Sequence, residues 1–114
     1  MQGFWLSFIT PLGRTVGAVS IVDWLRNEAV RIGAQGLTIS MAEGGYGRDH
    51  AYHSVHFFET GDQPVIVGMA VSPELADTLL ARINNAGLEI FYTKTPIEYG
   101  FAGEDAPRRY ASET

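Results

Sequence analysis

One pattern occurs twice along this chain, and it restricts the available folds more than any other feature. In each copy an apolar, strand-like run comes first, an amphipathic helix follows, and a glycine after the helix leads into a second strand-like run. The two helix exits match, with Gly36-Leu37-Thr38-Ile39 in the first copy and Gly87-Leu88-Glu89-Ile90 in the second. A duplicated strand–helix–strand pattern predicts an α+β domain in which helices cover one sheet.

The first copy begins with alternation and contains a well-marked helix. Large apolar residues recur at every second position from Phe4, which is the period of a strand, whereas the glycines that follow indicate a loop. Ser20 and Asp23 are typical of a first helical turn, and Glu28 is the one polar residue on the apolar stripe. The expected elements are a strand over residues 4–10, a loop over 12–19, a helix from the cap Ser20 to Gly33, and a strand over 37–41.

The second copy carries stronger signals. Residues 65–71 are almost uninterrupted apolar residues, as in a central strand. Ser72 is a favoured helix cap, and Pro73 fits the first helical position because its missing N–H would have no partner there. The expected elements are a strand over 65–71, a helix from Pro73 to about Ala86 that Gly87 stops, and a strand over 88–95 closed by Pro96. Together the two copies predict the ferredoxin-like fold, βαββαβ, with both helices on one face of an antiparallel sheet.

The composition fits one such domain and excludes several classes of function. The chain has 114 residues, of which 46% are hydrophobic and 18% charged, and its net charge of −5 leaves no broad positive field for nucleic acid. The absence of cysteine excludes disulfides and thiolate metal sites. No apolar run approaches the ~20 residues of a membrane span, and the first residues lack the basic start of a signal peptide. We expect a cytoplasmic domain over residues 1–100 and a polar tail over 101–114.

The sheet face away from the helices carries more apolar bulk than a solvated face usually does. Five large side chains are assigned to it, namely Trp5, Ile9, Phe58, Phe91 and Tyr92. A patch of this size on a small domain indicates self-association.

The connection between the two copies, residues 42–64, is much longer than the usual ~2–6 residues and is the first place to look for function. Its glycine-rich part, Gly44-Gly45-Tyr46-Gly47-Arg48, offers unhindered backbone N–H groups beside a guanidinium, a combination that suits an anion. Residues 52–58 alternate and are expected to form a ribbon arm. Lys94, the only lysine, lies on the last predicted strand and is the other candidate cation near this segment.

Four short motifs at these spacings resemble a known family. They are Gly36-x-Thr38, Gly45-Tyr46-Gly47-Arg48, His53-Ser54 and Asp62-x-Pro64-Val65. Over about residues 4–99 the chain resembles the PII-like family known as domain of unknown function 190, a relative of the nitrogen-regulatory PII proteins. The resemblance implies a ferredoxin-like homotrimer that binds adenine nucleotides or similar small effectors between subunits. It also implies a long loop, here residues 44–52, that docks on a regulated partner such as a membrane transporter or an enzyme.

The resemblance and the residue types together define a candidate site. The expected effector-binding residues are Thr38, Gly45, Tyr46, Gly47, Arg48 and Lys94. The expected partner-binding residues of the loop are Gly44, Asp49, His50 and Tyr52.

One departure from the PII pattern bears on the effector. PII proteins have a lysine before an isoleucine–phenylalanine pair, and here Glu89 precedes Ile90-Phe91. A carboxylate at that position would repel phosphate. AMP, ADP, a cyclic nucleotide, bicarbonate or no nucleotide at all therefore remain open as the ligand.

Two other classes of function compete with effector-dependent signalling. His50, His53 and His56 are the only histidines and lie three residues apart, so a metal-responsive or metal-tolerance protein of the same fold is the alternative. In a strand this spacing places His53 and His56 on opposite faces, which disfavours a site within one chain but not one shared across a trimer axis. A small enzyme ranks last, because no nucleophile motif is recognisable. We therefore expect a signalling protein without catalytic activity.

Overall fold

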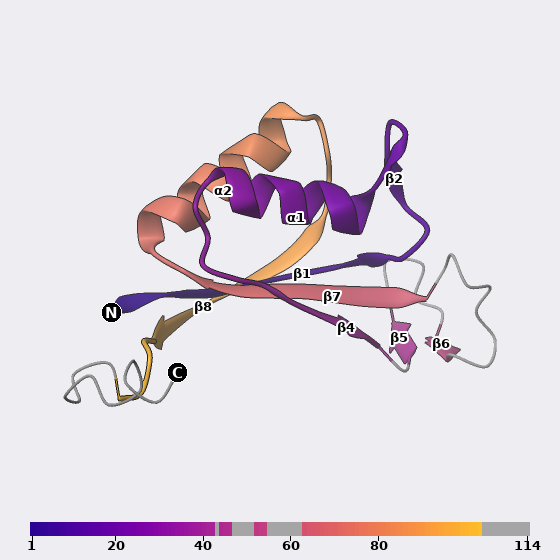
Figure 1. Ribbon diagram of the computed structural model, residues 1–114. Coiled ribbons are helices and arrows are strands. Elements are labelled where there is room, and N and C mark those ends of the chain that lie inside the picture. The colour runs from indigo at the N-terminus through magenta and orange to yellow at the C-terminus, as the bar shows by residue number, and fades with distance from the viewer. Residues whose placement is uncertain (43, 47–51, 55–62, 104–114) are drawn as a thin grey trace, which may run out of the picture.

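The computed structural model describes residues 1–42, 44–46, 52–54 and 63–103. Its elements are β1 (Gln2–Pro11), β2 (Thr15–Val16), β3 (Val19–Ser20), α1 (Ile21–Arg31), β4 (Thr38–Met41), β5 (Gly44–Tyr46), β6 (Tyr52–Ser54), β7 (Pro64–Val71), α2 (Pro73–Asn85) and β8 (Phe91–Glu98). The long strands form one antiparallel sheet in the order β4-β7-β1-β8, and both helices lie on the same side of it (Figure 1). The predicted mixed fold with an antiparallel sheet and two helices is confirmed.

Both helices begin and end where the sequence predicts. The hydroxyl of Ser20 accepts a hydrogen bond from the N–H of Asp23 at 3.1 Å, and that of Ser72 accepts one from Leu75 at the same distance. Each bond satisfies one of the N–H groups that a first helical turn leaves without a partner. Beyond the helix ends, Gly33 and Gly87 have φ angles of 85° and 70°, a conformation that glycine adopts without strain.

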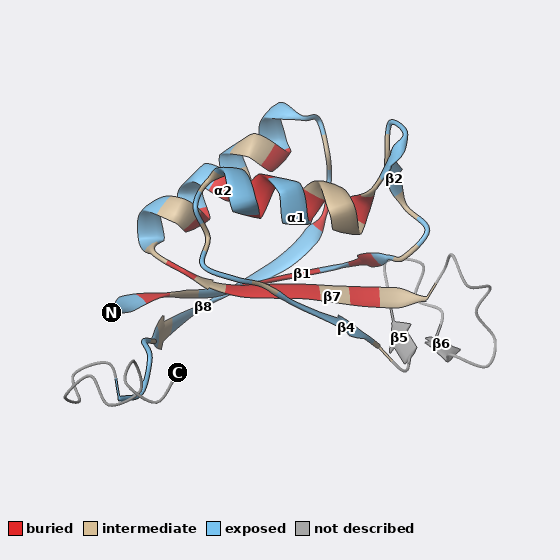
Figure 2. Ribbon diagram, viewed as in Figure 1, coloured by how far each residue is buried: buried red, intermediate tan, exposed pale blue. Residues whose placement is uncertain are grey.

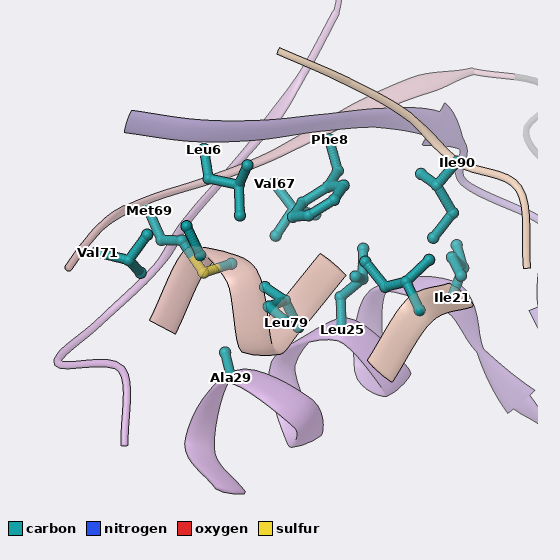
Figure 3. Packing of buried hydrophobic residues seen from close by; sticks show 12 residues of the cluster. Leu6, Phe8, Ile21, Leu25, Ala29, Val67, Met69, Val71, Leu79 and Ile90 are labelled. Carbon is teal, nitrogen blue, oxygen red and sulfur yellow. The ribbon is translucent and has the colours of Figure 1, made fainter. Parts of the chain in front are cut away.

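The core fills the space between the helices and one face of the sheet. Leu6 and Phe8 of β1 lie opposite Met69 and Val67 of β7, so the four side chains point to the same side. Figure 3 shows them packed against Leu25 and Leu79 from the two helices. Nearly all of these side chains are fully buried.

Glu28 is a charged residue within this buried layer. It is 6% exposed, and its carboxylate joins the two helices by accepting from Arg82 Nε of α2. Arg31 Nη1 lies 3.4 Å from the other carboxylate oxygen. The polar interruption of the apolar stripe therefore belongs to an ion pair between helices, which lets the carboxylate be buried.

One predicted strand boundary and one predicted loop are wrong. The last strand runs from Phe91 to Glu98 instead of 88–95, and Pro96 lies inside it, opposite Phe4. β8 is an edge strand, where a proline can turn its missing N–H away from the sheet. The expected loop over residues 12–19 contains the two-stranded hairpin β2–β3, whose base is tied to α1 by the Ile21 N–H bond to the Arg14 carbonyl at 2.8 Å.

The opposite sheet face is covered by no helix of the described chain. Trp5, Ile9 and Phe91, on alternate positions of β1 and β8, are 37%, 38% and 65% exposed, as expected for an open apolar face. Tyr92 is wrongly assigned to this face: it lies opposite Phe8 on the helix side, with ring centroids 6.3 Å apart. Adjacent residues of a strand point to opposite faces, so Phe91 and Tyr92 could not share one. Phe58 lies outside the described residues.

A close contact on the open face explains one glycine. A Cβ added at Gly68 of β7 would overlap the indole of Trp5. The ring therefore lies across the central strands, where only glycine leaves room for it. Figure 2 shows the contrast between the buried central strands and the exposed edge strands β4 and β8. Among the described residues, no helix is long and apolar enough to cross a membrane.

Candidate functional site

The connection over residues 42–64, hereafter the insert, joins the four-stranded sheet at one of its ends. Pro11 at the end of β1 lies opposite Pro64 at the start of β7, and Met41 at the end of β4 lies opposite Val65. Two backbone bonds of 2.9 Å close this end, from the Ala42 N–H to the Pro64 carbonyl and from the Leu12 N–H to the Gln63 carbonyl. The segment between β4 and β7 therefore leaves the sheet from a fixed base.

The described part of this segment is a ribbon. β5 and β6 pair antiparallel, with Gly45 opposite His53 and Tyr46 opposite Tyr52. The expected ribbon arm is confirmed over residues 52–54, and its partner strand is the first half of the glycine-rich motif, for which the sequence predicts a loop. Gly44, Gly45, Tyr46 and Tyr52 are thus brought together along the backbone. Gly47, Arg48, Asp49, His50 and His56 lie outside the described residues.

Thr38 lies on one edge of the sheet. It is an exposed residue of β4, opposite Gly68, on the face that neither helix covers. It belongs to the strand that leads directly into the β5–β6 ribbon. Thr38 and the ribbon are therefore positioned by one continuous stretch of chain.

Lys94 lies on the opposite edge. It is a residue of β8, opposite Leu6, so its side chain is on the helix face. Its Nζ is 3.9 Å from Asp77 Oδ1 of α2 and 4.3 Å from the centroid of the Phe4 ring. These contacts form an ion pair and a cation–π interaction within the chain.

Thr38 and Lys94 are not brought together within one chain. β7 and β1 separate their strands, which corresponds to roughly 14 Å at the usual strand spacing. The two residues also point to different faces of the sheet. A single site that uses both requires residues from two copies of the chain, and this assignment stays a prediction.

Arg14 is a residue that the sequence did not single out. It follows β1 by three residues, and its Nη1 donates to the Glu89 carbonyl at 2.6 Å. The bond links the β2–β3 hairpin to the turn between α2 and β8 across 75 positions of sequence. No local sequence motif predicts this contact. The connection after β1 and the connection before β8 reach the same end of the sheet only when β1 and β8 pair.

The described residues do not test the metal alternative. They contain no group of three or more His, Cys, Asp or Glu side chains that are close enough together to hold a metal ion. Only His53 of the three histidines falls within them, as a backbone position of β6. The histidine site stays a prediction without support from this part of the chain.

Several solved structures share this fold. CPII from Thiomonas intermedia K12, a nitrogen regulatory PII-like protein bound to ADP, AMP and bicarbonate, matches with a TM-score of 0.66 at 20% identity over 89% of this chain and 91% of that chain. The apo form of CPII matches with a TM-score of 0.60 at 17% identity over 89% of this chain and 95% of that chain. A candidate PII-like signalling protein from Thermus thermophilus matches with a TM-score of 0.63 at 19% identity over 91% of this chain and 94% of that chain.

These matches show that the chain has the fold of the PII-like proteins, as the sequence motifs predict. No family model matches the sequence, and no curated protein matches it. The narrower resemblance to domain of unknown function 190 therefore stays a prediction.

Proposed function

We propose that this chain is a PII-like signalling protein that binds a small anionic effector between the subunits of a homotrimer. Effector binding changes the arrangement of the loop over residues 44–52, and that arrangement decides whether a partner is bound. The chain has no catalytic activity of its own in this scheme. The regulated partner is a membrane transporter or an enzyme.

The observation that carries the proposal is the likeness to CPII. It extends over 89% of this chain, and that protein is bound to ADP, AMP and bicarbonate. All three ligands are anions with planar or tetrahedral oxygen groups, which backbone N–H groups and an arginine fork recognise well. The glycine-rich motif with Arg48 supplies this chemistry in the present sequence.

Two features of the fold support a site between subunits. Thr38 and Lys94 lie on opposite sheet edges, so a site that contains both needs a neighbouring chain. The open face with Trp5, Ile9 and Phe91 also offers an apolar surface that a second copy can bury. The same contacts would then build the assembly and complete the site.

The charge near the site favours a weakly charged effector. Glu89 is exposed in the turn that precedes β8, at the end of the sheet where the insert begins. Its carboxylate opposes each further negative charge on a ligand. We therefore expect AMP, ADP or bicarbonate to bind more tightly than ATP.

The regulatory step is a shift between loop arrangements. An effector can move this equilibrium only by binding one arrangement more tightly than the other. The base of the insert is fixed by the Ala42–Pro64 and Leu12–Gln63 bonds, so the change is confined to the segment beyond them. The partner then reads the segment and not the sheet.

Isothermal titration of the full chain with ADP, AMP, ATP, bicarbonate and Zn²⁺ tests the proposal, together with the mass in solution from sedimentation. We expect binding of at least one adenine nucleotide or bicarbonate, a trimer, and weaker binding in Arg48→Ala with the trimer retained. Binding of Zn²⁺ alone that His53→Ala abolishes would replace the proposal with the metal alternative. A monomer that binds none of these anions would refute it.

A further inference from the structure

Arg14, the residue just before β2, is held by three hydrogen bonds. Its N–H bonds to the Pro11 carbonyl at 3.1 Å, and its carbonyl accepts from Ile21 at 2.8 Å. Its Nη1 donates to the Glu89 carbonyl at 2.6 Å. Backbone and side chain are thus fixed by three different parts of the fold, so little conformational entropy is left to lose when the guanidinium binds something else.

Arg14 also differs from the other cationic side chains of the described ranges in its partner. Arg26 pairs with Asp23, Arg31 and Arg82 pair with Glu28, and Lys94 lies by Asp77. Within the described residues, Arg14 contacts a main-chain carbonyl and no carboxylate. In this part of the chain, it is therefore the one cationic side chain whose charge no side-chain carboxylate balances.

The location of this charge connects it with the effector. Arg14 follows the end of β1, and Glu89 precedes the start of β8, so both lie at the end of the sheet from which the insert leaves. A guanidinium has five N–H donors, and the bond to Glu89 uses one of them. The remaining donors keep the fork geometry that suits a carboxylate, a bicarbonate or a phosphate.

We propose that Arg14 is an anion-binding residue of the effector site, with the Glu89 carbonyl holding its guanidinium in the binding orientation. This inference rests on the function proposed above and names one specificity-determining residue for it. In this scheme the Glu89 carbonyl acts on the effector through the cation that it orients.

The test compares matched arginine variants of the full chain. Arg14→Ala, Arg14→Lys and the control Arg26→Ala are titrated with ADP, AMP and bicarbonate, and the urea midpoint of each variant is measured. Arg26 is an exposed α1 arginine paired with Asp23, so its loss should leave affinity within about twofold of wild type. We expect Arg14→Ala to weaken the binding of the anion that wild type binds by about tenfold or more, the effect of one charged hydrogen bond.

The lysine variant separates binding from folding. Arg14→Lys keeps a charge and a donor for the Glu89 carbonyl but lacks the fork, so we expect a wild-type urea midpoint and an affinity between those of wild type and Arg14→Ala. Wild-type affinity in both Arg14 variants would overturn the role of Arg14 and leave the proposed function standing. A wild-type chain that binds none of the anions would overturn both.

Discussion

The two faces of the four-stranded sheet are built from alternate residues of the same strands, yet the described chain completes only one of them. On the helix face, Leu6 and Phe8 are fully buried under α1 and α2. On the open face, Trp5 and Ile9, from neighbouring positions of the same strand, remain more than a third exposed. The comparison separates a face that the chain covers with its own helices from a face that no described helix covers.

The largest loss of stability is expected when one aromatic ring is removed from the helix face of the sheet. Phe8→Ala should lower the free energy of unfolding by about 3–5 kcal/mol, since it removes buried area and leaves a cavity under the helices. Urea unfolding followed by circular dichroism measures the change. A loss below about 1 kcal/mol would mean that the helix layer does not form a tight core.

The next prediction tests the ion pair inside the helix layer. Arg82→Ala should cost about 2–3 kcal/mol, because the buried Glu28 carboxylate loses its partner on the other helix. Arg31→Ala is the matched control and should cost only about 0–1 kcal/mol, since Arg31 is mostly exposed and its contact is longer. Equal losses of unfolding free energy in urea would show that neither arginine is the specific partner of the Glu28 carboxylate and that each contributes only a nearby positive charge.

A smaller effect is expected where the open face is most tightly packed. Gly68→Ala should cost about 1–2 kcal/mol, because the added methyl group must displace the Trp5 indole. The control is Gly36→Ala, where an added Cβ meets nothing within 4 Å. A changed near-ultraviolet circular dichroism signal in Gly68→Ala alone would locate the effect at Trp5; identical spectra and stabilities would contradict it.

The smallest effect on folding is expected for a substitution on the open face, and it best distinguishes the two faces of the sheet. Phe91→Ser should change the chain's own folding free energy by less than about 0.5 kcal/mol, since its ring is largely in solvent. If the open face is a subunit interface, the same change should lower the mass in solution from about three times 12.5 kDa. Phe101→Ser, at a phenylalanine equally exposed but beyond β8, should leave the mass unchanged. Sedimentation velocity distinguishes the two variants.

Most of the fold could be predicted because its signals are local. The caps Ser20 and Ser72 and the glycines that end the helices act within one turn, and residues 65–71 announce a central strand by composition alone. The extent of β8 could not be predicted in this way. Pro96 ends a central strand but not an edge strand, and only the strand order makes β8 an edge.

The candidate site was less predictable for the same physical reason. Thr38 and the ribbon belong to one stretch of sequence, so their neighbourhood is a local property. The separation of Thr38 from Lys94 depends on sheet order, and the contact of Arg14 with Glu89 depends on the closure of connections 75 positions apart. A search for sequence motifs finds neither the separation nor the contact, because both depend on how the strands are ordered in the sheet.

The fixed base of the insert has a consequence for the way such a protein can change over evolution. The Ala42–Pro64 bond closes the segment between β4 and β7, so residues added to it outside the β5–β6 ribbon affect stability through the entropy of a closed loop. That entropy grows with the logarithm of length, and doubling the segment costs only about 0.6 kcal/mol. Insertions and deletions there are therefore cheap, while the strands on either side keep their register. A lineage can therefore exchange this segment for one of another length or sequence while the four-stranded sheet keeps its fold.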